Sequence, residues 1–382
     1  MNTIKKELEI LEYYEDEVSN DNYENTKEEI LDDLLDDEDA IEAAEEQYEN
    51  RKEESKHKKK VRTTLMAAFL RNGPIERVTN WEFRRLFPLR TLDVDSADVL
   101  VGNQTDGSII LIIILSLRKR PETGIDDALE MLGGVRDNNS ALSDDINLDF
   151  RNDRIQTAIA IEPARANDTA VAIEEYEQSV TDPEDFYVWR ITGTEGAKID
   201  IYTDFPSDPG QNRCHDGDLG QVLDPGREIM DSPHVLPDFF YDTHHSLLLE
   251  HTIIKMASNH LDTDIPNTHF STQELRNYFD STLYGSDSTH KASILTGRVI
   301  QLWEHLDIMT KVSDSNDKID DGSTVYRLRS RKQNPQTIYD DVSDNYDEKC
   351  NEFLIESKAM EQTIEQFEED KGVQADLATF SS

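Results

Sequence analysis

One stretch of ten residues limits the folds open to this chain more than any other. Residues 108–117 read SIILIIILSL, and the seven residues IILIIIL at 109–115 contain no polar side chain. A β-branched run without polar alternation is typical of a strand that is buried on both faces. It is also far shorter than the roughly 20 residues that a membrane-spanning helix needs. We therefore expect a central strand with helices on both faces of its sheet.

The neighbouring segments predict the rest of this domain. ADVLVG at 97–102 is expected to form a strand, joined to the central one by a turn at Asp106-Gly107. A helix over 125–136 that ends at a glycine pair comes next, followed by the strand QTAIAIEP, the helix NDTAVAIEEYEQ and the strand DFYVWRIT. Helical segments broken at Gly73-Pro74 come first and carry Leu65, Phe69, Trp81, Phe83 and Leu86. This pattern predicts an α/β domain with a mixed sheet over residues 56–205.

The order of elements over residues 61–190 resembles the PD-(D/E)XK nuclease fold, also called restriction-endonuclease-like. In that family a helical Glu precedes a strand Asp, and the next strand carries Glu-x-Lys. The carboxylates hold Mg²⁺, which activates water against a phosphodiester, and the Lys steadies the developing charge. Asp98 lies where the family Asp belongs, and Glu76 or Glu82 matches the helical acid.

This chain departs from the family at the Glu-x-Lys position, which falls on Ser116-Leu117-Arg118. Serine is a neutral ligand and cannot replace a hard anionic one for Mg²⁺. A carboxylate from the next helix (Asp127 or Glu130) or Glu162 after the following strand would restore the site. The resemblance thus implies a degenerate site without a cofactor, or a Mg²⁺ site if it is active, built from Asp98, Ser116, Arg118, Glu82 and Glu130.

The charge of the chain indicates its solvent. It holds 81 Asp+Glu against 39 Lys+Arg, a formal net charge of −42. Such self-repulsion strains a compact fold unless concentrated salt shortens the Debye length, to about 3 Å at 1 M. In this respect the chain resembles proteins of halophilic archaea, their plasmids and their viruses. Its two distant cysteines exclude a disulfide framework, and MNTIKKELEI lacks the apolar core of a signal peptide, so we expect a soluble, cytoplasmic protein.

The charge changes sign after residue 50. Residues 51–90 contain 12 Lys+Arg and 4 Asp+Glu, a local net charge of +8, including the run KHKKK at 56–60. A basic segment can be a loose linker, but it is also what a phosphate backbone requires.

A second domain is predicted over residues 246–332, after a Pro-rich linker at 206–245. LLLEHTIIKMA at 247–257 is expected to be its first helix, and Ser271 and Glu274 form a capping box that opens the second. A third helix, from Thr296 to Leu306, is followed by two short strands at 311–312 and 325–328. Three helices followed by a β-ribbon are typical of a winged helix-turn-helix.

Residues 290–332 carry eight Lys+Arg and six Asp+Glu, a positive balance in an acidic chain. A recognition helix contacts bases in the major groove, while the wing contacts phosphates. Winged helices also serve as protein–protein modules, which would leave these residues without a DNA role. The candidate DNA contacts are Lys291, Ser293, Thr296, Arg298 and Gln301, at and within the third helix, and Lys311, Arg327 and Arg329 near the ribbon.

Both ends of the chain, 1–55 and 333–382, are expected to be acidic and helical. Residues 1–50 hold 20 acids and 3 bases, and a heptad-like seam at 30–48 is interrupted by Asp37. Three readings remain open: solvated acidic extensions, a short coiled coil for self-association, or packing of the two ends on each other. The apolar stripe expected in the second end comprises Tyr346, Cys350, Phe353, Met360, Ile364 and Phe367.

Seven of the ten histidines lie between 215 and 269. Zinc needs three or four ligands at defined spacing, and no CxxC or HxxxH kernel is present. We expect these histidines at the surface, without a metal.

Taken together, these patterns predict a DNA-binding protein of a halophilic archaeon or its mobile element, with an inactive nuclease-like domain and a winged helix. Double-stranded DNA is the expected partner, with a homo-oligomer formed through the helical ends and no membrane contact. The alternatives are an active Mg²⁺-dependent endonuclease with a rearranged site, or an oligomerising structural or assembly protein.

Overall fold

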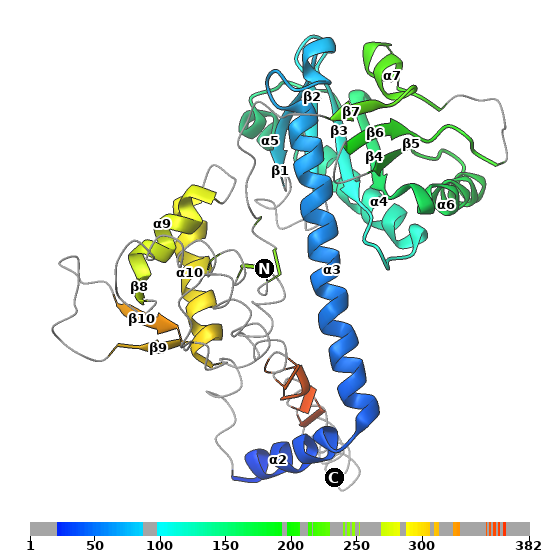
Figure 1. Cartoon of the computed structure of the whole chain (residues 1–382). Helices are drawn as coiled ribbons and strands as arrows, with labels where there is room; N and C mark the ends of the chain where they lie inside the picture. The colour runs from blue at the N-terminus through cyan, green and yellow to red at the C-terminus, as the bar shows by residue number, and fades with distance from the viewer. Residues whose placement is uncertain are drawn as a thin grey trace, which may run out of the picture. The chain divides into compact units, whose positions relative to one another are not determined.

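The computed structural model divides the chain into two compact units, Lys56–Pro237 and Met1–Ser55 with Asp238–Ser382. The boundary falls within one long helix, α3 (Glu38–Phe69) (Figure 1). No helix among the described residues is long and apolar enough to cross a bilayer. The described residues are 21–86, 98–192, 197–206, 213–215, 217–229, 240, 243–244, 247–248, 252, 269–282, 288–305, 309–312, 324–328, 349, 351–352, 354–356, 358–359 and 362–363.

The first unit is built on a mixed sheet of seven strands, whose order in space follows the order in the chain. Its three middle strands, β3 to β5, run parallel, and the flanking strands pair antiparallel. The strands are β1 (Trp81–Leu86), β2 (Val99–Asn103), β3 (Ser108–Ile114), β4 (Ile155–Ile161), β5 (Phe186–Thr192), β6 (Ala197–Ile201) and β7 (Arg227–Ile229).

The strand β3 is interior, as its apolar run predicts. It pairs with β2 on one side and with β4 on the other, and all seven of its residues are buried. Burying an Ile or Leu side chain stabilises the fold by roughly 1.5–3 kcal/mol. This strand is therefore a major source of the unit's stability.

Helices cover both faces of this sheet, as predicted. Ile109, Leu111 and Ile113 share a core with α4 (Pro121–Asp137), α5 (Asn139–Ile146) and α6 (Ala166–Ser179). Val188 of β5 belongs to the same core, so its neighbour Trp189 points to the opposite face. There the ring of Phe69 at the end of α3 stacks on Trp189, with centroids 5.8 Å apart.

Three sequence predictions in this unit are wrong. Trp81, Phe83 and Leu86 lie on the strand β1 rather than on a helix, because the edge of β2 offers backbone pairing to this aromatic segment. The helix α4 continues through its glycine pair to Asp137. The expected linker contains α7 (Gly217–Leu223) and β7, which adds a seventh strand by pairing with β6.

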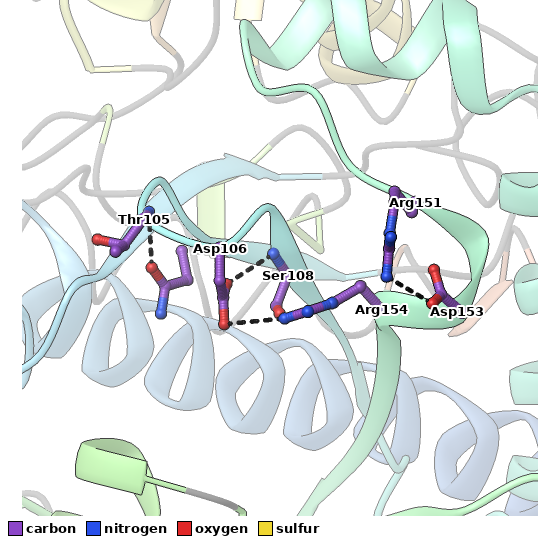
Figure 2. A network of polar contacts seen from close by, with 7 residues as sticks. Thr105, Asp106, Ser108, Arg151, Asp153 and Arg154 are labelled. Atoms are coloured by element: carbon purple, nitrogen blue, oxygen red, sulfur yellow. Dashed lines mark hydrogen bonds and ion pairs between the residues drawn. The ribbon is translucent and has the colours of Figure 1, made fainter.

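The predicted turn at Asp106-Gly107 joins β2 to β3 and is held by side chains (Figure 2). Gly107 has φ +69°. The Asp106 carboxylate accepts a hydrogen bond from the Ser108 N–H at 3.0 Å and pairs with Arg154 at 3.4 Å. Arg154 closes the short 3₁₀ helix Asn152–Arg154 before β4, so this network links the starts of two neighbouring strands. Two further 3₁₀ helices are Glu76–Val78 and Pro163–Arg165.

The second unit contains a three-stranded antiparallel sheet of order β8-β10-β9. The predicted capping box is confirmed: the Ser271 N–H donates to Glu274 Oε2 at 2.7 Å, and the Glu274 N–H donates to Ser271 Oγ at 3.1 Å. Most of the predicted first helix lies outside the described residues. The elements in chain order are β8 (His269–Ser271), α9 (Thr272–Thr282), α10 (Ser288–His305), β9 (Met309–Lys311) and β10 (Val325–Leu328).

The two ends of the chain pack on each other, which is one of the three readings that the sequence left open. The helix α2 (Asp21–Leu35) ends just before Asp37, and α3 begins at Glu38. Leu34 and Ala44 share a small core with Ile355 and Ala359 from the helical residues near the C-terminus. The apolar stripe predicted for the C-terminal end lies outside the described residues.

Two glycines should respond oppositely to replacement by alanine. A Cβ on Gly133, within α4, would meet nothing within 4 Å, so Gly133→Ala should stabilise the protein by about 0.5–1 kcal/mol. At Gly107 a Cβ would lie 2.7 Å from the Asp149 carbonyl oxygen at positive φ, so Gly107→Ala should cost about 2 kcal/mol. Chemical denaturation at constant salt measures both changes. Equal effects of the two variants would contradict the left-handed turn.

Candidate functional site

Asp98, the predicted family aspartate, immediately precedes β2 and is buried at the end of the neighbouring strand β3. Its Oδ1 atom lies 2.5 Å from the Arg62 guanidinium of α3, and its Oδ2 atom accepts a hydrogen bond from the Ile114 N–H at 2.8 Å. Asp98 is 7% exposed and Arg62 is 2% exposed. Both carboxylate oxygens are therefore engaged by protein donors in a nearly dry site.

Glu162 directly follows β4 and meets a second base of the same helix. His57 Nδ1 lies 3.5 Å from Glu162 Oε1, with the imidazole buried and the carboxylate partly exposed. The carboxyl ends of β3 and β4 lie at one edge of the sheet because the two strands are parallel. The helix α3 thus presents a base to an acid at each of these strand ends.

The connection from β3 to α4 carries Ser116 and Arg118. The Arg165 guanidinium donates to the backbone carbonyls of Ser116 and Lys119, which ties this connection to the start of α6. Ser116 is half-buried and Arg118 is exposed. The Ser116 backbone lies two residues beyond Ile114, the residue whose N–H binds Asp98.

The other predicted acids lie elsewhere. Glu82 is on the edge strand β1, not on a helix, and pairs with Arg84 at 3.2 Å. Glu130 is exposed on α4, and Asp127 pairs with Lys119. Within the described part of the chain, no three His, Cys, Asp or Glu side chains form a group that could hold a metal ion.

His215 is buried, contrary to the expectation of a surface position. The Trp189 indole N–H donates to its Nε2 at 2.9 Å, so Nδ1 carries the proton and donates to Gln156 Oε1 at 2.6 Å. Its ring stacks on Tyr187. Burial lowers the pKa of His215 to about 3 because the charged form would lose its hydration. This histidine is a neutral part of the core.

The predicted DNA contacts occupy two elements of the second unit. Ser293 and Gln301 are exposed on α10, and Lys291 and Arg298 belong to the same helix. Thr296 is 4% exposed and its hydroxyl donates to the Ala292 carbonyl, so the prediction of a groove contact is wrong for this residue. Lys311 on β9 and Arg327 on β10 are exposed, and Arg329 lies outside the described residues.

Sequence reasoning missed the partners of the candidate acids. Arg62 and His57 lie in the basic segment that the charge count singled out. That count showed a local excess of bases, but not that two of them turn inward to acids 36 and 105 residues further along the chain. The signal that could have identified Arg62 and His57 is the helical pattern of residues 57–69, in which both occupy positions on the buried face.

The chain matches no protein-family model, no curated protein and no solved structure. Its function therefore has to be inferred from its own residues and geometry.

Removing the carboxylate of Asp98 should destabilise the first unit strongly. Asp98→Asn leaves the Arg62 charge buried without its counter-ion, which costs about 3–5 kcal/mol. The matched control is Asp153→Asn, because Asp153 and its partner Arg151 are both 67% exposed (Figure 2). That change should cost less than about 1 kcal/mol. Denaturant midpoints measure both, and similar losses would contradict the buried-pair description.

His215 should make the protein less stable in acid. Its folded pKa of about 3 lies below the ordinary 6.5, so the unfolded chain binds a proton first as the pH falls. The contribution of His215 is full above about pH 6.5 and decreases towards pH 3, by up to about 1.4 kcal/mol per pH unit. His215→Gln should remove this one-proton contribution from the slope of the unfolding free energy against pH. Parallel profiles for wild type and variant would contradict a neutral buried histidine.

Proposed function

We propose that the protein binds double-stranded DNA through residues 269–328, acting as a winged helix-turn-helix. The observation that carries this proposal is the element order β8-α9-α10-β9-β10 with β10 placed between β8 and β9. In a winged helix this arrangement makes the second helix of the pair the recognition helix and the last two strands the wing. The helix α10 and the β9–β10 ribbon take these roles here.

The two sides of α10 support a groove-reading role. Leu295, Val299 and Trp303 are buried in the unit. Ser293, Gly297 and Gln301 recur at every fourth position and are exposed, and a Cβ on Gly297 would meet open space. A glutamine can pair bidentately with adenine, and a serine can hydrogen-bond to any base edge. A glycine between them lets the helix backbone approach the groove closely.

The ribbon supplies charge for the phosphate backbone. Arg327 of β10 lies opposite Thr310 of β9, and Lys311 lies opposite Tyr326. Both bases are exposed. Phosphate contacts of this kind position the protein but carry no sequence information.

We further propose that the first unit is a nuclease-like domain without catalytic activity. The support is the state of Asp98, whose carboxylate binds Arg62 and the Ile114 N–H and is not open to a hard cation. Ser116 adds no anionic ligand. If a rearranged site did bind Mg²⁺, the alternative function would hold, and the protein would be an active endonuclease.

The assembly alternative draws less support from the ends of the chain. The apolar seam that was expected to drive self-association is used within one chain, since Leu34 and Ala44 pack with Ile355 and Ala359. The acid excess supports a setting of molar salt, as in halophilic archaea or their mobile elements. Counterion release contributes little there, so base contacts and shape must supply more of the affinity.

Substitutions on α10 and on the ribbon should differ in effect. Gln301→Ala and Arg298→Ala should each weaken binding to a preferred site by about 1–3 kcal/mol and relax its sequence preference. Arg327→Ala should weaken binding to all duplexes alike and lower the salt slope by about 0.9. Site selection from random duplexes, followed by titrations in 0.2–2 M KCl with and without Mg²⁺, measures these changes.

The matched control is Arg227→Ala, which removes an exposed positive charge from β7 of the other unit. It should bind like the wild type. A wild-type protein that binds no duplex at any salt would contradict the DNA proposal. Mg²⁺-dependent cleavage of the duplex by the wild type would contradict the inactive domain and favour the endonuclease alternative.

A further inference from the structure

Thr272, the first residue of α9, makes three hydrogen bonds to Thr324, the residue just before β10. The Thr272 N–H donates to the Thr324 carbonyl at 2.9 Å, and the Thr272 hydroxyl donates to the same oxygen at 3.0 Å. In return, the Thr324 N–H donates to Thr272 Oγ1 at 3.0 Å. These bonds join two positions that lie 52 residues apart in the chain.

The three bonds extend the pairing of β8 with β10 by one residue, into the helix. Ser271 is the last residue of β8 and pairs with Val325, so Thr272 and Thr324 are the next pair in register. In a regular antiparallel pair the Thr324 N–H would donate to the Thr272 carbonyl. Helix geometry directs that carbonyl along the axis of α9, and the Thr272 hydroxyl accepts the bond in its place. The hydroxyl therefore completes a strand pairing that the backbone of a helical residue cannot complete.

The N-terminus of α9 does not depend on this hydroxyl. The capping box of Ser271 and Glu274 already satisfies N–H groups there, because each of these residues donates its N–H to the side chain of the other. The hydroxyl of Thr272 turns to Thr324 instead. A threonine at this position thus serves the link between the helix and the ribbon.

A second contact places β10 against the helices of the unit. Tyr326 of β10 is 6% exposed, and its ring stacks on Phe270 of β8 with centroids 6.2 Å apart. Burial and the carboxylate of Glu304 on α10 raise the pKa of Tyr326, so this side chain faces α10. Side chains alternate along a strand, so Arg327 points to the opposite side of the ribbon, where it is exposed. The two attachments determine where Arg327 lies relative to α10.

We infer that Thr272 is a positioning residue for DNA binding, whose hydroxyl holds the β9–β10 ribbon where Arg327 reaches the phosphate backbone. Thr324 lies three residues before Arg327, which is about 10 Å along the strand. A change in the pairing of Thr324 therefore displaces the Arg327 guanidinium. The inference rests on the proposed function, because it requires that the ribbon binds phosphates while α10 reads the groove.

The link between Thr272 and Thr324 contains no charged group. An ion pair between partly exposed side chains would weaken in concentrated salt, which shortens the Debye length. Hydrogen bonds between a hydroxyl and backbone groups depend much less on ionic strength. The ribbon should therefore keep its position over the salt range in which its phosphate contacts weaken.

The test uses the full-length chain and Thr272→Val, which keeps the shape of the side chain and removes the hydroxyl. Thr324 is half-buried, so water can satisfy its N–H in this variant. Thr272→Ala replaces it if the valine variant does not fold, and Thr272→Ser retains the hydroxyl. Thermal unfolding verifies that each variant is folded, and amide exchange at Thr324 measures the link itself.

The matched control is Thr363→Val, which removes a threonine hydroxyl from the same unit outside residues 269–328. Thr363 is buried, and its hydroxyl donates to the Ala359 carbonyl at 2.7 Å. The probes are the site selected by the wild type and a random-sequence duplex, both titrated across 0.2–2 M KCl.

Thr272→Val should weaken binding to both duplexes by the same factor, severalfold at the lowest salt. The slope of log K against log salt should fall by up to about 0.9, the share of one phosphate contact. The ratio of the two affinities should stay at the wild-type value, because the substitution does not change α10. Thr272→Ser and the control should match the wild type in affinity and in slope.

A double-mutant cycle with Arg327→Ala separates positioning from a general weakening of the fold. If Thr272 acts through Arg327, Thr272→Val/Arg327→Ala should bind about as strongly as Arg327→Ala alone. Losses that add, or a Thr272→Val variant that binds like the wild type, would overturn the inference.

The same titrations distinguish this inference from the proposed function. If Arg327→Ala lowers the salt slope but Thr272→Val does not, the inference fails and the winged-helix proposal stands. If the wild type binds duplex but Arg327→Ala has no effect, the phosphate role of the ribbon fails together with the inference. A wild type that binds no duplex at any salt would overturn both.

Discussion

The strand β3 has no side exposed to water, and this constraint organises the whole first unit. Its backbone groups need a paired strand on each edge, which β2 and β4 provide. Its side chains need an apolar layer on each face, which requires α4 and α6 on one side and α3 on the other. Because β4 runs parallel to β3, the crossover through α4 leaves two strand ends and a connecting loop at one edge.

The helix α3 packs on the sheet and also supplies the basic side chains that meet the acids at that edge. The residue that packs it on the sheet, Phe69, lies about two turns from Arg62 and about three from His57, and these two residues meet the acids at the strand ends. One helix therefore makes both the apolar contact with the sheet and the contacts with Asp98 and Glu162. At this edge the Arg62 guanidinium occupies the carboxylate that a divalent cation would need, which is why we propose that this unit has no catalytic activity.

Sequence patterns predicted the elements whose signal is local. The run at 108–117, the turn at Asp106-Gly107 and the Ser271–Glu274 capping box are all present where the sequence placed them. The predictions failed where partners decided the outcome. The segment beginning at Trp81 became a strand because β2 offered it an edge, and β7 formed inside an expected linker because β6 did the same. Among the candidate groove contacts, Ser293 and Gln301 are exposed, but the sequence did not show that Thr296 faces the core.

By itself the sequence determined that this chain needs a doubly covered sheet, carries acidic ends and concentrates its positive charge in a few segments. These properties follow from residue type and spacing alone, since burial and charge density are set by the side chains present. Only the tertiary structure decided which bases meet which acids, that the two ends pack together, and that His215 lies in the core. Each of these depends on contacts between residues far apart in the chain, and their energies exist only once folding has brought the partners together.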